Sequence, residues 1–211
     1  MRDLIYYVAC TVDGFIARPD GSVDFALPEG EHLTDLARSF PETFPTHLRG
    51  AFNIAGPNRL FDTVLMGRKT YQVGLDAGFT NPYGHLRQYV FSRSLARSPE
   101  PNIELVSSDP LPFVAVLKRQ PGLNIWLCGG AELATVLFPL IDELIVKVNP
   151  VLIGSGIPLF SGGTGQAHLT LLSTKAYENG FTLSHYRVKP LHIDHHTRNS
   201  LSPSPSASSP K

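Results

Sequence analysis

Residues 124–140, NIWLCGGAELATVLFPL, carry the clearest fold signal in the chain. An apolar, β-prone run ending at Cys128 meets Gly129 and Gly130, and apolar residues then recur at helical spacing. This pattern predicts a strand, a tight turn and a helix. Glycines at such a turn adopt positive φ and lack a Cβ, so a phosphate can approach the unpaired N–H groups of the first helical turn. A plain strand-to-helix connection is the alternative, and the sequence around the motif must decide between them.

The composition indicates one globular domain without a dominant charge. The chain has 211 residues, of which 42% are hydrophobic and 17% charged, enough for one sizeable core. Lysine plus arginine equals aspartate plus glutamate at 18 each. With no net field, we expect neither nucleic acid nor an acidic membrane surface as a partner, and any anionic ligand must be held locally.

The two cysteines and the apolar runs predict a cytoplasmic protein. Cys10 and Cys128 each lie inside an apolar run, which is typical of buried reduced thiols rather than a disulfide framework. Residues 4–12, LIYYVACTV, are too short and too rich in β-formers for a signal peptide. No run approaches the roughly 18 apolar residues of a membrane span.

Strands and helices alternate along the chain, which predicts an α/β fold with a mostly parallel sheet. Residues 4–12 are apolar nearly throughout, as in a central strand covered on both faces. Asn179-Gly180 is a favoured turn pair for a closing antiparallel hairpin. We expect strands at 4–12, 15–17, 61–66, 86–91, 103–107, 124–128, 143–148, 169–177 and 181–188, and helices at 30–40, 46–55, 110–120 and 131–140.

The last residues differ in character from the rest. Residues 191–211 lack apolar periodicity and are rich in serine and proline, so we expect a disordered tail after one domain at residues 1–190. His192, His195 and His196 lie at its start. Without a cysteine or acidic cluster at fixed spacing to complete a ligand set, no metal site is predicted.

Three predicted strands end in residues that suit an anion. The first ends in Gly67 followed by Arg68, Lys69 and Thr70, the second in Ser92-Arg93, and the third in Gly129-Gly130. In an open α/β sheet, ligands bind at the carboxyl ends of strands, so three such ends predict one elongated crevice for a dinucleotide. The first strand lacks a following G-x-G-x-x-G, which argues against a conventional Rossmann dehydrogenase.

These motifs occur in an order that resembles a known superfamily. LIYYVACTVDGFIA, VLMGRKTYQ, YVFSRS, NIWLCGGAELATVLF and DELIVKVNPVLIGSGIPLF follow one another along residues 1–188. The order looks like the dihydrofolate reductase superfamily, closer to the branch resembling the reductase domain of riboflavin biosynthesis than to true dihydrofolate reductases. The resemblance implies a three-layer dihydrofolate reductase-like fold.

The same resemblance implies NADPH as the hydride donor and places its binding residues. Gly67, Arg68 and Thr70 match the segment that holds the 2′-phosphate and pyrophosphate, and Ser92 and Arg93 match the segment at the adenosine and 2′-phosphate. Gly129 and Gly130 match the diglycine beside the pyrophosphate, and the backbones of Ala9 and Ile16 match those that hold the nicotinamide carboxamide. Independently of the resemblance, arginines such as Arg68 and Arg93 are what the extra phosphate of NADPH requires.

The proton donor is less evident. Phe25-Ala26-Leu27-Pro28 resembles the stretch before the catalytic acid of dihydrofolate reductases, but Gly30 occupies the position of the acid. Glu29 and Glu31 flank it, and either would serve as a general acid if burial raised its pKa. The alternative is a charge that stabilises a helix N-terminus. Asp13, in a Val-Asp-Gly turn, is a third candidate or a turn former.

The sequence therefore predicts an NADPH-dependent reductase that transfers a hydride to a small pteridine- or pyrimidine-like heterocycle, or a related C=N or C=O acceptor. Two alternatives remain, a catalytically inactive NADPH-binding module and a scaffold that dimerises through its hairpin. The resemblance to riboflavin-type reductases, which pair through their sheets, also implies a homodimer.

Overall fold

The structure is a computed structural model that describes residues 1–95 and 97–190. It contains ten strands and four α-helices, with two short 3-10 turns. The strands are β1 (Leu4–Thr11), β2 (Phe15–Ala17), β3 (Phe61–Gly67), β4 (Arg87–Phe91), β5 (Ile103–Val106), β6 (Asn124–Gly129), β7 (Glu143–Asn149), β8 (Ile157–Pro158), β9 (Ala167–Ala176) and β10 (Thr182–Pro190). The helices are α1 (Glu31–Ser39), α2 (Arg68–Asp76), α3 (Pro110–Leu117) and α4 (Ala131–Leu137), and the turns are η1 (Pro41–Thr43) and η2 (Phe138–Leu140).

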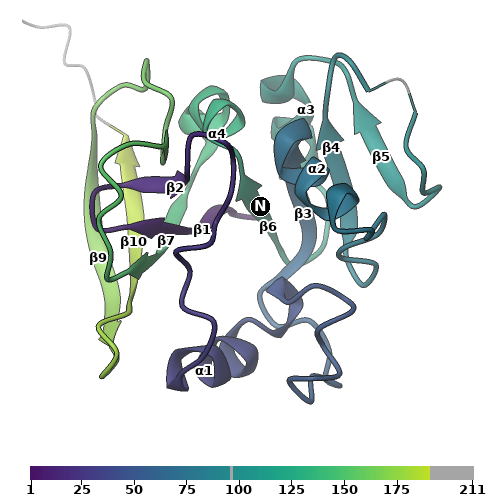
Figure 1. The fold of residues 1–211 in the computed structure, drawn as a ribbon. Helices are drawn as coiled ribbons and strands as arrows, with labels where there is room; N and C mark the ends of the chain where they lie inside the picture. The colour runs from purple at the N-terminus through teal and green to yellow at the C-terminus, as the bar shows by residue number, and fades with distance from the viewer. Residues whose placement is uncertain (96, 191–211) are drawn as a thin grey trace, which may run out of the picture.

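Eight strands form one sheet in the order β5-β4-β3-β6-β1-β7-β10-β9 (Figure 1). The pairings from β5 to β7 are parallel, and β10 pairs antiparallel with both β7 and β9. The hairpin turns at Gly180, whose φ of 83° is one that glycine adopts readily. The predicted α/β fold with a mostly parallel sheet and a C-terminal antiparallel hairpin is confirmed.

Two apolar clusters, one on each face of the sheet, form the core. Alternate residues of a strand point to opposite faces, so Tyr6 of β1 packs with α3 and α4, whereas Tyr7 packs on the face that carries α1 and α2. β1 is buried along almost its whole length. Its predicted central position follows from this double coverage.

The short strands β2 and β8 pair with each other outside the main sheet. β8 was not predicted from the sequence. A Cβ placed on Gly156 would lie 2.3 Å from the carbonyl oxygen of Ala17, so only glycine lets the chain pass β2 at this distance. Gly156 thus fixes where the loop after β7 joins the turn after β1.

The helix predicted at residues 46–55 is wrong. The segment is a succession of hydrogen-bonded turns that includes contacts from Leu48 N to Pro45 O and from Ile54 N to Arg49 O. Asn53 has a φ of 53°, outside the helical region. Proline before the segment and glycine within it interrupt the repeating helical bonds that its apolar residues suggested.

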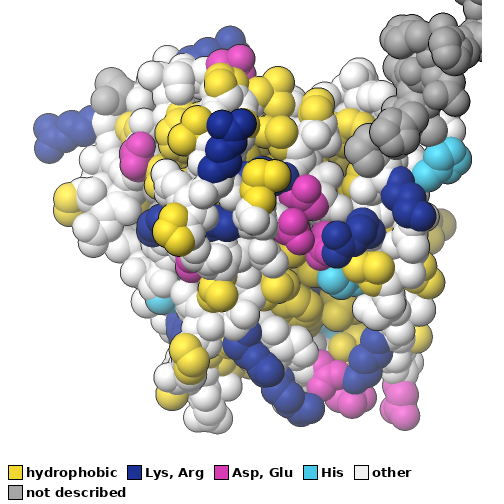
Figure 2. Space-filling view, turned by 180° about the vertical axis from the view of Figure 1, so that it is seen from behind, with side chains coloured by type: hydrophobic (Ala, Val, Ile, Leu, Met, Phe, Trp, Pro, Cys, Tyr) yellow, Lys and Arg dark blue, Asp and Glu magenta, His cyan; other side chains and the backbone are white. Residues whose placement is uncertain are grey.

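Charged side chains of both signs are interspersed on the face shown in Figure 2, in keeping with the balanced composition. Within residues 1–95 and 97–190, no helix is long and apolar enough to cross a membrane. The predicted tail at 191–211, with His192, His195 and His196, lies outside the described residues.

Candidate functional site

The three strand ends that the sequence suggests for anion binding lie together at the carboxyl end of the sheet. β4, β3 and β6 are adjacent and parallel. Their register pairs Gly67 with Phe91, the residue before Ser92, and pairs Met66 with Gly129. The carboxyl ends of the three strands therefore reach the same level, as the sequence predicted.

Gly67, Thr70, Gly129 and Gly130 form a closely packed group, called here the glycine shelf. A Cβ on Gly67 would lie 3.5 Å from the backbone nitrogen of Gly130. A Cβ on Gly129 or Gly130 would lie 3.6 or 3.5 Å from the Thr70 hydroxyl oxygen. Gly129 has a φ of 145°, which other residues rarely adopt. Gly129 is buried, and Gly67, Thr70 and Gly130 are partly exposed. The shelf is thus backbone and one hydroxyl without Cβ atoms between them, which suits the close approach of a phosphate.

The N-terminus of α2 adds unpaired donors and positive charge to the glycine shelf. Gly67 is its N-cap residue and provides no side-chain hydrogen bond to the first turn. Arg68 and Lys69 follow, where the helix dipole disfavours cations unless an anion is bound. Lys69 pairs with Glu132 of α4 at 3.8 Å, but both side chains are more than 80% exposed, so this pair contributes little.

Ser92 and Arg93 follow β4 beside the glycine shelf, and they differ in availability. Ser92 is buried, and its hydroxyl oxygen accepts hydrogen bonds from the backbone nitrogens of Ser94 and Leu95. Its first role is therefore to turn the chain. Arg93 and Arg68 are exposed, and neither forms an ion pair with any residue that the structure describes. Two free guanidiniums thus accompany the shelf.

Next to the glycine shelf, the face of the sheet that carries α1 and α2 becomes accessible. On three neighbouring strands, a buried residue is followed two positions later, on the same face, by a partly exposed one. The pairs are Tyr7 and Ala9 on β1, Trp126 and Cys128 on β6, and Ile145 and Lys147 on β7. Ala9, Cys128 and Lys147 are called here the floor. Cys128 directly precedes Gly129, so the floor and the shelf are continuous.

Ile16 lies on β2, within the connection that follows β1. Asp13 holds this connection in place. Its carboxylate accepts a hydrogen bond from the Thr11 hydroxyl at 2.5 Å and others from the backbone nitrogens of Ile153 and Gly154 at 3.1 and 2.7 Å. The Thr11 bond is the main reason why the pKa of Asp13 lies below its usual value. A carboxylate with a lowered pKa is a poor proton donor at neutral pH, so the geometry favours the turn-forming role.

The two glutamates near α1 lack the environment that a general acid needs. Glu29 and Glu31 are exposed, the latter in the first turn of α1. The burial on which their catalytic role depended is therefore absent for both side chains. Glu31 at this position stabilises the helix dipole, which was the alternative interpretation.

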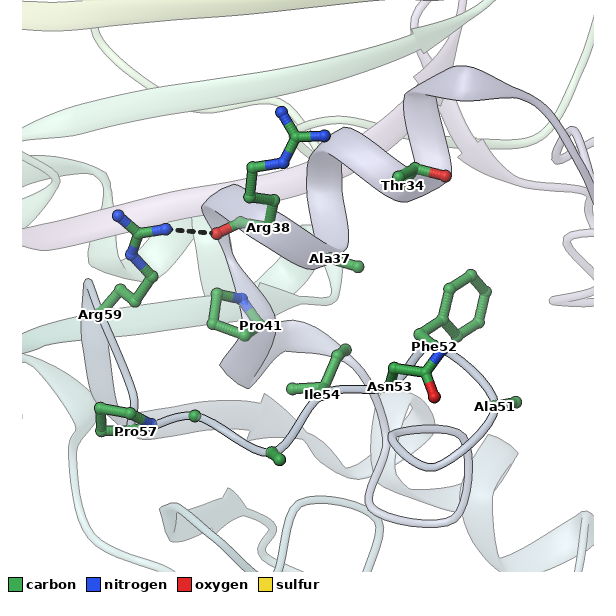
Figure 3. A pocket seen from close by; sticks show the side chains of 12 residues that line it. Thr34, Ala37, Arg38, Pro41, Ala51, Phe52, Asn53, Ile54, Pro57 and Arg59 are labelled. Carbon is green, nitrogen blue, oxygen red and sulfur yellow. Dashed lines mark hydrogen bonds between the residues drawn. The ribbon is translucent and has the colours of Figure 1, made fainter.

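A cavity of about 680 Å³ lies between α1 and residues 51–59 (Figure 3). Phe52 and Ile54 line one side and Ala37 of α1 the other, and Arg59 donates a hydrogen bond to the Arg38 carbonyl oxygen across one end. Arg59, which lines the cavity, is two residues before the start of β3, so the cavity lies toward the amino end of that strand. None of the predicted site residues lines it.

Two polar side chains of the α1-covered face were missed in the sequence. His32 is buried, and its ring packs on Phe181 at a centroid distance of 4.3 Å. Lys147 interrupts the apolar run ELIVKV, and counting alternate residues from Ile145 would have placed it on the same face. No group of three or more potential metal ligands occurs in the part of the chain that the structure describes.

This chain is similar to known proteins in sequence and in fold. The chain is 34% identical over 189 residues to a Bacillus subtilis (strain 168) protein named "Uncharacterized protein YwjB", covering 89% of this chain and 99% of the relative. A solved structure, "Putative riboflavin biosynthesis protein" from Shewanella sp. PV-4, is similar with a TM-score of 0.66 at 21% identity, covering 90% of this chain and all of that one.

A bifunctional protein of Thermotoga maritima, named diaminohydroxyphosphoribosylaminopyrimidine deaminase/5-amino-6-(5-phosphoribosylamino)uracil reductase, has a similar fold. Its TM-score is 0.59 at 15% identity, over 89% of this chain and 57% of the larger one. The profile of the RibD C-terminal domain family matches residues 2–183. That match covers every strand of the sheet except most of β10, and it includes the glycine shelf and the floor. The chain belongs to the RibD C-terminal domain family, with a dihydrofolate reductase-like fold.

Proposed function

We propose that this protein is an NADPH-dependent reductase that acts on a small pyrimidine- or pteridine-like molecule. The observation that carries the proposal is the convergence of the glycine shelf with Arg68 and Arg93 at the carboxyl ends of three adjacent strands. Bare backbone donors with free guanidiniums beside them are the chemistry that binds a phosphate-rich dinucleotide. The names of the solved relatives, which include a uracil reductase, support a pyrimidine-like acceptor.

In this proposal, each part of the chain has one task. The glycine shelf binds the pyrophosphate, Arg68 and Arg93 bind the 2′-phosphate, and Ser92 contacts the adenosine segment. The backbones of Ala9 and Ile16 orient the nicotinamide, and NADPH supplies the hydride when bound. The buried face below the floor excludes water and holds the acceptor against the nicotinamide.

Two measurements separate this function from its alternatives. Thermal shift with NADPH and NADH tests cofactor binding, and loss of reduced-nicotinamide absorbance with pyrimidine and pteridine acceptors tests turnover. A stabilising shift with NADPH and turnover support the reductase. Binding without turnover would indicate an inactive module, and no shift would indicate a scaffold. The predicted homodimer is tested by light scattering.

Replacing Gly130 by alanine should weaken NADPH binding by roughly 10- to 100-fold. The added methyl group would overfill the contact between the glycine shelf and the bound nucleotide, and such overpacking costs about 1–3 kcal/mol. The added methyl group would occupy the space above Thr70 that the proposal gives to the pyrophosphate. Its contact at 3.5 Å is an ordinary one, so we expect the melting temperature to change little. Isothermal titration with NADPH measures the effect.

Gly50→Ala is the matched control, since a Cβ there meets nothing within 4 Å. Unchanged NADPH affinity in Gly130→Ala would remove the glycine shelf from the pyrophosphate site.

Replacing Arg68 by alanine should weaken binding of NADPH more than binding of NADH. A hydrogen bond to a charged group contributes about 1.5–3 kcal/mol, so we expect roughly a 10- to 100-fold loss for NADPH. NADH lacks the 2′-phosphate, and its affinity should barely change. Arg119→Ala, at an exposed arginine after α3, is the control. Equal losses for both nucleotides would exclude Arg68 from the 2′-phosphate role.

A further inference from the structure

Lys147 is a cation on the accessible part of an otherwise apolar face. It lies on β7, in register with Ala9 on one side and with Leu183 of β10 on the other. Ile145, two residues earlier on the same face, is 1% exposed, whereas Lys147 is only partly buried. The side chain therefore leaves the sheet at the floor, beside the backbone proposed to orient the nicotinamide.

The ammonium group of Lys147 has an aromatic partner but no acidic one. Its Nζ lies 3.9 Å from the centre of the Tyr7 ring, a cation–π contact. No described carboxylate lies within salt-bridge distance of Nζ, and no hydrogen bond from it is found among these residues. Among the described residues, therefore, no acceptor binds the three N–H donors of Nζ.

The titratable groups around Lys147 come from several elements. The Cys128 thiol of β6 lies near Lys147, and Tyr83 contacts Cys128. From α1, His32 packs against Phe181 with the two rings tilted, and Asp35 is bound to Lys175 of β9. Burial raises the pKa of the Cys128 thiol to about 11, so it is neutral at neutral pH. Lys147 is thus the charged group that the floor offers to a ligand.

We propose that Lys147 is the proton donor of the reaction, its ammonium group hydrogen bonding to the carbonyl oxygen or imine nitrogen of the acceptor. This inference rests on the proposed reductase function. The acceptor carbon gains the hydride from NADPH, and the adjoining oxygen or nitrogen gains a proton from Lys147. The π electron pair of the C=O or C=N bond moves to that oxygen or nitrogen, and loss of the hydride would convert NADPH to NADP+. The neutral amine of Lys147 then recovers a proton from solvent, so the step consumes two electrons and one proton together with the hydrogen nucleus that the hydride carries.

The protonation behaviour of Lys147 suits this role. Burial among apolar groups disfavours the charged form and lowers its pKa to about 8. An ammonium with a pKa near the working pH is largely protonated at pH 7 and still releases its proton readily, which is the requirement for general acid catalysis. Glu29, Glu31 and Asp13 lack a corresponding property, as their exposure and hydrogen bonds show.

The test compares Lys147→Met, Lys147→Arg and the control Lys175→Met. The control replaces a lysine on β9 in the same row of the sheet, whose partner is Asp35. The acceptor probes are 5-amino-6-(5-phosphoribosylamino)uracil and 7,8-dihydrofolate, each with NADPH from pH 6 to 9.5. NADPH affinity is measured for every variant, so that loss of cofactor binding is not mistaken for loss of proton transfer.

We expect Lys147→Met to reduce kcat by roughly 100-fold or more, in line with general acid catalysis, while NADPH affinity stays within about twofold. In the wild type, kcat should fall as the pH rises through about 8, because the ammonium loses its proton there. Lys147→Arg, which keeps the charge but holds its proton, should bind the acceptor and show no such inflection. Lys175→Met should behave like the wild type.

A second readout does not depend on turnover. In protein labelled with [ε-13C]lysine, the NMR signal absent from Lys147→Met should titrate near pH 8 and shift when the uracil probe is added. If the wild type turns over and Lys147→Met has the same kcat and pH profile, the inference about Lys147 is overturned and the proposed reductase function stands. A wild-type protein that shows no NADPH binding would overturn both.

Discussion

Replacing Glu42 by alanine should lower the free energy of unfolding by about 3–5 kcal/mol, since each unsatisfied buried donor costs about 1–3 kcal/mol. Glu42, in η1, is fully buried, and its carboxylate accepts hydrogen bonds from the backbone nitrogens of Arg59, Leu60 and Phe61 at 3.2, 2.7 and 2.8 Å. These donors lie where the chain enters β3. Removing the acceptor leaves them unpaired, which outweighs the relief of no longer burying a charge. Urea unfolding measures the loss.

Two further variants sharpen the Glu42 prediction. Glu42→Gln keeps one acceptor oxygen but turns an NH2 group toward a backbone donor, so we expect about half the loss. Glu104→Ala, at an exposed glutamate on β5, should stay within about 0.5 kcal/mol of the wild type. A loss below about 1 kcal/mol in Glu42→Ala would show that water or a rearranged turn satisfies the three donors.

Replacing Gly156 by alanine should destabilise the protein by about 2–3 kcal/mol, near the upper range for overpacking. The new methyl group would lie 2.3 Å from the Ala17 carbonyl oxygen and 3.2 Å from the Phe15 Cβ. Backbone must therefore move, and the pairing of β2 with β8 is the contact that separates. Because Ile16 lies on β2, we also expect weaker NADPH binding under the proposed function. Differential scanning calorimetry with and without NADPH measures both effects.

Gly165→Ala is the matched control for Gly156→Ala. It lies on the same stretch between β7 and β9, and a Cβ there meets nothing within 4 Å. It should melt like the wild type. If Gly156→Ala kept both stability and the NADPH-dependent shift, the loop after β7 would have to be far more yielding than its contacts with β2 indicate.

The fold could be predicted because local and global signals agree along most of the chain. The apolar run of β1 matches a strand covered on two faces, and the Asn179-Gly180 turn matches the hairpin. The segment at 46–55 escaped prediction since its turns are fixed by tertiary bonds, such as those from Arg49 to the carbonyl oxygens of Pro41 and Gly56. Periodicity over a short window does not contain this information.

The candidate site was predictable to a different extent at its two ends. Glycines and arginines at strand ends point to phosphate chemistry by residue type alone, and parallel pairing brought those ends together. At the acceptor end, whether a side chain can act as a general acid depends on its burial, and the burial of Glu29 and Glu31 cannot be read from the sequence. Lys147 has its distinctive environment because Tyr7 and Cys128, remote in sequence, lie beside it. The NADPH roles assigned to Ala9, Ile16 and the shelf residues stay predictions for the binding experiments.

The position of β6 has a consequence for how the protein is made. This strand is inserted between β1 and β3 and pairs with both, although it begins 113 residues after the end of β1 and 57 after the end of β3 (Figure 1). A nascent chain that has not yet reached Asn124 holds two apolar strands with no common neighbour. The sheet therefore cannot form across β1 and β3 until β6 has been synthesised. A chain interrupted before β6 would expose unpaired strand edges prone to aggregation and would not form a smaller folded unit.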